Sequence, residues 1–82
     1  NAGYLDTLGW AHYKLGQYAE AVPVLERAVQ RASDAPLLQL HLGMALHKSG
    51  DTVRAQDFLR KAIASKVTLP NLDEARLLIA QK

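Results

Sequence analysis

The stretch LGWAHYKLG at residues 8–16 returns as LGMALHKSG at residues 42–50, where five of the nine positions are identical. A fixed period of this length is typical of repeat proteins, in which each unit buries its apolar face against the next. We therefore interpret residues 2–35 and 36–69 as two copies of one unit, followed by a shorter segment at residues 70–82. The same shift of 34 residues aligns further identical pairs, among them Ala21 with Ala55, Leu25 with Leu59, Ala28 with Ala62, and Pro36 with Pro70.

Each unit has the apolar spacing of two helices. In the first unit, apolar residues recur every three or four positions up to Leu15, and Gly16 then favours the end of a helix. In the second unit, Gly50 has the same place, and Asp51 is suited to cap the helix that follows. Asp34 is the expected N-terminal cap of the first helix of the second unit. The spacing predicts helices over residues 3–15, 18–32, 36–48, 52–65 and 71–81, which is an all-α fold.

Composition and charge exclude several classes of protein. The 82 residues include ten basic and eight acidic side chains without a run of lysine or arginine, so nucleic acid is not the expected partner. The absence of cysteine excludes disulfides and thiol chemistry. No apolar stretch approaches the roughly 20 residues that a membrane span needs, so we expect no direct membrane insertion.

No pattern of catalytic or metal-binding residues is present. His12, His41 and His47 occur without an HExxH motif or a cysteine. Six residues separate His41 from His47, which places them on different sides of a helix. The serines lie at expected helix ends with no base placed by a motif, and the glycines follow the repeat instead of forming a phosphate loop. We therefore expect no enzyme, no metal and no cofactor.

The repeat resembles the tetratricopeptide repeat, which has a period of 34 and the signature W-x2-L-G-x2-Y, A-x3-F and P. The first unit reads L-x2-L-G-x2-H from residue 5 and A-x3-L from residue 21; the second reads Q-x2-L-G-x2-L from residue 39 and A-x3-L from residue 55. The small residues match, whereas the signature tryptophan, tyrosine and final proline are replaced. The resemblance covers about residues 2–69. It implies two helix-turn-helix hairpins of a right-handed α-solenoid, with a capping helix after them.

The resemblance also implies packing roles for the matching residues. Gly9 and Gly43 would let the first helix of each hairpin approach the second closely, opposite Ala21 and Ala55. Alanines at the end of each unit would make room for the next helix along. The predicted repeat-packing residues are Leu8, Gly9, Ala21, Ala28, Leu42, Gly43, Ala55 and Ala62.

A concave groove formed by the first helix of each repeat is the binding surface that the resemblance implies. Mapping its usual positions onto this chain yields six residues, Asp6, Trp10, Tyr13, Leu40, Met44 and His47. These six residues lie outside the hairpin core, which we expect to consist of leucines 8, 15, 25, 42 and 59. We therefore expect an apolar and aromatic groove that holds an amphipathic helix or an extended peptide. The alternative is that Trp10 and Met44 pack against the neighbouring repeat and the closing helix.

Two narrower resemblances bear on the partner and the location. Chaperone-binding members clamp a C-terminal carboxylate with Lys and Asn, but this chain has Asp6, Trp10 and His41 at three of those positions, so no such ligand is expected. Residues 6–10 with 13–14, and residues 41–43, resemble the C-terminal repeats of large bacterial tetratricopeptide proteins, including lipoproteins of exopolysaccharide and PEP-CTERM sorting systems. That resemblance implies an exported parent with its lipid-bearing cysteine upstream; a cytoplasmic location is the alternative.

The two ends of the array differ. Residues 70–82 lack a third Leu-Gly pair, so we expect their helix to cover the second hairpin. No such helix precedes the first hairpin, and repeat arrays usually need about three units. We therefore expect its face to meet further repeats of the parent chain or, in isolation, another copy. The predicted function is a protein-interaction module within a larger scaffold, and the alternative is an architectural end segment or a self-association module.

Overall fold

Five helices make up the described part of the chain, which is residues 1–66 and 68–80 of a computed structural model. They are α1 (Ala2–Lys14), α2 (Tyr18–Arg31), α3 (Pro36–Ser49), α4 (Thr52–Ala64) and α5 (Leu72–Ala80). The predicted spans agree with these bounds to within one residue at each end, except that residue 81 lies outside the described residues. The all-α fold class is confirmed. None of the described helices is long and apolar enough to cross a membrane.

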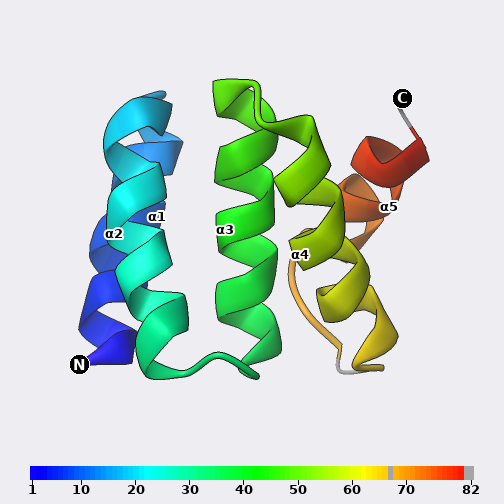
Figure 1. Cartoon of the computed structure of the whole chain (residues 1–82), viewed down its shortest axis with the longest axis horizontal. Helices are drawn as coiled ribbons and strands as arrows, with labels where there is room; N and C mark the ends of the chain where they lie inside the picture. The colour runs from blue at the N-terminus through cyan, green and yellow to red at the C-terminus, as the bar shows by residue number, and fades with distance from the viewer. Residues whose placement is uncertain (67, 81–82) are drawn as a thin grey trace.

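The helices form two antiparallel hairpins and a closing helix (Figure 1). The first hairpin is α1 with α2, and the second is α3 with α4. α2 packs on α3 and joins the two hairpins, while α5 packs mainly on α4 at the opposite end from α1. One end of the stack is therefore covered by a short helix, and the other end presents α1 and α2.

A glycine and a capping aspartate mark the boundary between α3 and α4, as the sequence predicts. Gly50 follows α3 in the left-handed region, with φ of 102°, which a residue with a side chain rarely adopts. Asp51 then caps α4, because its Oδ1 accepts a hydrogen bond of 3.2 Å from the backbone N–H of Arg54. The predicted cap at Asp51 is confirmed.

The predicted cap at Asp34 is wrong. α3 begins at Pro36, and Ala35 takes the cap position without any side-chain hydrogen bond. Proline at the first helical position already has a helical φ and has no N–H to be capped, so a capping side chain is less needed there. Asp34 lies exposed in the turn before Ala35.

Each hairpin closes around one glycine and one leucine. A Cβ added at Gly9 would lie 2.6 Å from Cγ of Leu25, and one added at Gly43 would lie 2.8 Å from Cδ2 of Leu59. Both leucines are fully buried. The two hairpins therefore have the same internal contact, as the 34-residue repeat requires.

Leu8 and Leu15 do not belong to the hairpin core, which corrects the sequence analysis. Leu8 is 38% exposed and Leu15 is 74% exposed. Because Gly9 faces α2, the residue before it is turned about 100° away, toward the open side of α1. Leu15 follows the last residue of α1 and extends beyond the packed part of the helix.

Two apolar clusters stabilise the stack. The first joins α1, α2 and α3, with Leu25 and Leu42 among its buried residues. The second joins α3, α4 and α5, where Ala75 and Leu78 of the closing helix pack with residues of the second hairpin. The partners of those two residues in the second cluster are Leu40, Met44, Leu59 and Ala62. The closing helix thus buries a surface that the second hairpin would otherwise expose.

Candidate protein-interaction surface

The six predicted groove residues lie on α1 and α3 but differ in their exposure. Trp10, Tyr13 and His47 are half-buried, and Asp6 is buried. Leu40 and Met44 are fully buried because they pack with α5 in the second apolar cluster. This corrects the expectation that all six line an open groove. The alternative considered for Met44, packing against the closing helix, is the arrangement that the structure shows.

An aromatic stack crosses the junction of the two hairpins. The ring of Trp10 lies between those of Tyr13 and His41, with centroids 4.3 Å and 3.8 Å away and interplanar angles of 6° and 9°. The ammonium of Lys14 lies 5.5 Å from the Trp10 ring centroid, a distance typical of a cation–π contact. Trp10 therefore shows features of both alternatives. It packs against the neighbouring hairpin, as the packing alternative expects, and it remains partly exposed, as a groove residue would.

A buried hydrogen bond reinforces the same junction. Nδ1 of His41 donates to Oδ1 of Asp6 over 2.7 Å, and both side chains are buried. An ionised carboxylate has only acceptors, so the imidazole N–H is its natural partner. Because Asp6 is on α1 and His41 is on α3, the bond connects the two hairpins directly. Among the described residues, no cluster of three or more potential metal ligands forms around this pair or elsewhere.

His41 is the residue at this surface that sequence analysis did not assign to the groove. The sequence analysis considers it as a metal ligand, in the carboxylate clamp and in the narrower bacterial resemblance, but not as a groove residue. Its position one residue after Leu40 placed it beside the predicted groove, but an isolated helix pattern does not show that α1 faces that side of α3. The contact of His41 with its buried partner Asp6 depends on how the two hairpins pack in the tertiary structure.

The next junction along the stack has an apolar version of the same arrangement. A shift of 34 residues takes Asp6, Trp10 and His41 to Leu40, Met44 and Ala75. The first three make the polar and aromatic contact between α1 and α3, and the second three pack together between α3 and α5. α5 therefore occupies the place that a third repeat would give to its first helix.

Tyr13 packs against α2 and against the second apolar cluster, to which α5 contributes. Its ring meets that of Tyr18 edge to face, with centroids 5.3 Å apart. Burial raises the pKa of the Tyr13 hydroxyl to about 12, and the nearby negative charge of Glu74 on α5 adds to the rise. The charge of Glu74 acts on Tyr13 at a distance, because the described helices α1 and α5 do not pack directly on one another.

Alkaline titration should detect the effect of the Glu74 charge on Tyr13. The folded pKa of Tyr13 is above the ordinary value of 10.0, so the stability that the shift contributes is fully present below pH 10 and is lost as the pH rises toward about 12. We expect Glu74→Gln to lower the pKa of the late-titrating tyrosine, measured by phenolate absorbance and assigned by its loss in Tyr13→Phe. The control is Asp73→Asn, one residue earlier on α5, which should leave that pKa unchanged. An unchanged titration in Glu74→Gln would contradict the placement of the Glu74 carboxylate near Tyr13.

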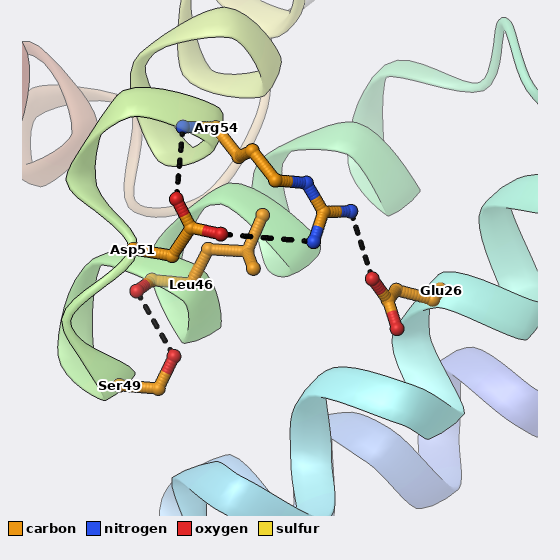
Figure 2. Close-up of polar contacts among 5 residues, drawn as sticks. All are labelled: Glu26, Leu46, Ser49, Asp51 and Arg54. Atoms are coloured by element: carbon orange, nitrogen blue, oxygen red, sulfur yellow. Dashed lines mark hydrogen bonds and ion pairs between the residues drawn. The ribbon is translucent and has the colours of Figure 1, made fainter.

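On the opposite side of the hairpin junction, an ion pair joins α2 to α4 (Figure 2). Nη2 of Arg54 donates to Oε2 of Glu26 over 2.7 Å, and Nη1 lies 3.7 Å from Oδ2 of Asp51. The hydrogen bond with Glu26 raises the pKa of Arg54 further. Both side chains remain partly exposed, so the pair contributes about 0.5 kcal/mol to stability.

Two stacked helix-turn-helix hairpins with a closing helix define a helical repeat protein of the α-solenoid class. The family model for the tetratricopeptide repeat matches residues 7–66. The chain therefore belongs to the tetratricopeptide repeat family, a non-enzymatic module whose repeats generally mediate protein–protein interaction or scaffolding. Comparison with curated proteins yielded no match, and neither did comparison with solved structures. The narrower resemblance to exported bacterial lipoproteins stays a prediction.

Proposed function

We propose that this chain holds a peptide or helix of another protein against the inner surface formed by α1 and the C-terminal half of α3. The observation that carries the proposal is the half-exposed edge of the aromatic stack at Trp10 and Tyr13. His47 stands at the repeat position of Tyr13 on the neighbouring helix and is also half-exposed. Aromatic residues are enriched at the centres of interfaces, where they provide large contact areas at small entropic cost.

The closed half of the predicted groove limits the size of the bound segment. Leu40 and Met44 are covered by α5, so they offer nothing to a partner while that helix is docked. The remaining open surface suits one or two apolar anchors of a peptide. Lys14 and Lys48 are exposed at equivalent repeat positions beside this surface, which favours acidic residues next to the anchors.

A selection from a displayed peptide library would test this surface. Peptides that bind the immobilised chain should lose about tenfold in affinity on His47→Ala or Tyr13→Ala, which is typical of truncating a central contact. Val53→Ala is the matched control, because Val53 is 80% exposed on α4 and should leave affinity unchanged. Thermal melting must show that each variant is folded, and Tyr13→Phe provides a variant that keeps the ring. Binders that ignore both Tyr13 and His47 would contradict the proposal.

A second candidate function is architectural, as a segment that extends a longer repeat array or associates with another chain. It is favoured by the apolar side chains that α1 exposes on its outer side, with Tyr4 65% exposed. Chemical-shift mapping separates the two candidates. Changes confined to Tyr13, His47 and their neighbours support peptide binding, whereas changes confined to Tyr4 and Leu8 support the architectural function.

A further inference from the structure

The closing helix α5 is held by a small set of apolar contacts. It has nine residues, of which Ala75 and Leu78 are buried. Both pack in the second apolar cluster, with Leu40, Met44, Leu59 and Ala62. Isolated helices of fewer than about 12 residues are marginal in water, so α5 depends on this packing for its stability. An element held in this way can leave its site and return without unfolding of the remaining protein.

The connection between α4 and α5 has an unfavourable backbone conformation near each end. Lys66 has a φ of 62° and Asn71, directly before α5, has a φ of 66°. No other described non-glycine residue has a positive φ, and the chain has glycine at two other left-handed positions, Gly16 and Gly50. The left-handed region is disfavoured for residues with a Cβ, and asparagine tolerates it better than lysine does. The connection that keeps α5 on its own chain is therefore strained, mainly at Lys66.

The same connection is long enough for α5 to reach a neighbouring molecule. Residues 65–71 separate the two helices, and seven extended residues span about 23 Å. That reach is comparable with the two shorter dimensions of the chain, 24 and 19 Å. Pro70 opposes the merging of α4 and α5 into one continuous helix, because proline has no N–H to donate and clashes with the preceding turn.

The surface beneath α5 requires a cover of the same kind. Leu40 and Met44 are fully buried there, and their exposure to water would be unfavourable. The α5 helix of a second copy is complementary to this surface because its sequence is identical. Exchange would restore the contacts of α5 in both molecules and release the left-handed backbone at Lys66. Short connections under strain favour exchange of this type.

We propose that two copies of this chain associate by exchanging α5, so that Ala75 and Leu78 of each copy pack on α3 and α4 of the other. This interface is separate from the outer side of α1, which the architectural candidate uses. The closed chain competes with exchange through an effective concentration that is about millimolar for a short connection. Strain in both connections favours the open form, so the dimer should have a dissociation constant on the order of 100 µM.

Sedimentation of the full chain between about 10 µM and about 1 mM measures this association. Lys66→Gly should raise the dissociation constant about tenfold, because glycine adopts a positive φ readily and the closed chain is then unstrained. Asp34→Gly is the matched control. Asp34 is also exposed between two helices but does not have a positive φ, so its replacement should leave the dissociation constant unchanged.

NMR on a mixture of labelled and unlabelled chains identifies the exchanged helix. Equal amounts of isotope-labelled and unlabelled chain are unfolded, mixed and refolded at about 1 mM, and only NOEs between labelled and unlabelled molecules are selected. Exchange predicts such NOEs between the methyl groups of Leu78 and Met44, because the two side chains belong to the same packed cluster.

Each result supports or overturns the proposal. A dimer with intermolecular NOEs between Leu78 and Met44 that Lys66→Gly weakens supports it, and a monomer at every concentration overturns it. A dimer with intermolecular NOEs at Leu8, in which Leu78 contacts Met44 only within one chain, overturns exchange and supports the architectural candidate. Exchange that Lys66→Gly leaves unchanged overturns the role assigned to the strained connection.

Peptide binding at Tyr13 and His47 does not depend on these results, because α5 covers the same residues in the closed and the exchanged forms.

Discussion

Gly43→Val is expected to lower the free energy of unfolding by about 3 kcal/mol, which is close to 15 °C in melting temperature for a domain of this size. The new Cβ would lie 2.8 Å from both Cγ and Cδ2 of Leu59, and 3.2 Å from the backbone oxygen of Ala55. Leu59 is fully buried, so it has no free space into which to move. The hairpin must then open or its helices must shift apart.

Two further variants test this explanation. Gly3 is also in a helix, but a Cβ there would meet only Oδ1 of Asn1, at 3.5 Å, so Gly3→Val should change stability by less than about 0.5 kcal/mol. Leu59→Ala removes the side chain that collides with position 43, and the double variant should therefore be more stable than the sum of the single changes predicts. Only partial recovery is expected, because the contact with the Ala55 oxygen remains. Strict additivity in chemical unfolding would show that the close approach of α3 and α4 is not what Gly43 provides.

Asp6→Leu is expected to lower the free energy of unfolding by about 2–3 kcal/mol. The substitution leaves His41 buried between the hairpins without its acceptor, and a buried polar group without a partner keeps its full desolvation cost. Asp34→Leu is the matched control, since Asp34 is exposed in a turn and should change stability by less than about 0.5 kcal/mol. Urea unfolding followed by circular dichroism and by Trp10 fluorescence measures the loss.

The apolar second junction shows which substitutions should compensate for the loss of the Asp6–His41 bond. Leu40, Met44 and Ala75 pack at the second junction in the repeat positions of Asp6, Trp10 and His41. The triple variant Asp6→Leu, Trp10→Met, His41→Ala should therefore recover at least half of the stability that Asp6→Leu loses, followed by circular dichroism alone because Trp10 is absent. Replacing both members of a buried polar pair by apolar groups of suitable shape can be nearly neutral. If Asp6→Leu alone is as stable as the original chain, the buried bond is not a determinant of the junction.

The helices and their order follow from local signals. Gly16, Gly50 and Asp51 act within one turn of chain, so the sequence was enough to place those helix ends to within one residue. The cap at Asp34 failed because Pro36 and Asp34 are competing local signals, and the proline set the first turn of α3. The repeat of 34 residues likewise required no tertiary information, because it is a property of the sequence itself.

The candidate site was less predictable, for a physical reason that Leu8 and Leu40 illustrate. Helical periodicity shows that a helix has an apolar face, but both residues belong to apolar faces and only one is buried. Leu40 is covered because α5 folds back over α3, and Leu8 is exposed because no described helix packs on its side of α1. The bond between Asp6 and His41 depends in the same way on how two hairpins meet.

By itself, therefore, the amino-acid sequence determined the two repeat units, the five helices and the family to which the chain belongs. The tertiary structure alone decided which apolar faces are covered, which half of the predicted groove is closed, and that the first junction is held by a buried Asp6–His41 bond. Helix boundaries depend on residues a few positions apart, whereas burial depends on helices that are distant in the chain and close in space. Tyr13 and His47 remain half-exposed after that packing, and the apolar residues on the outer side of α1 remain exposed.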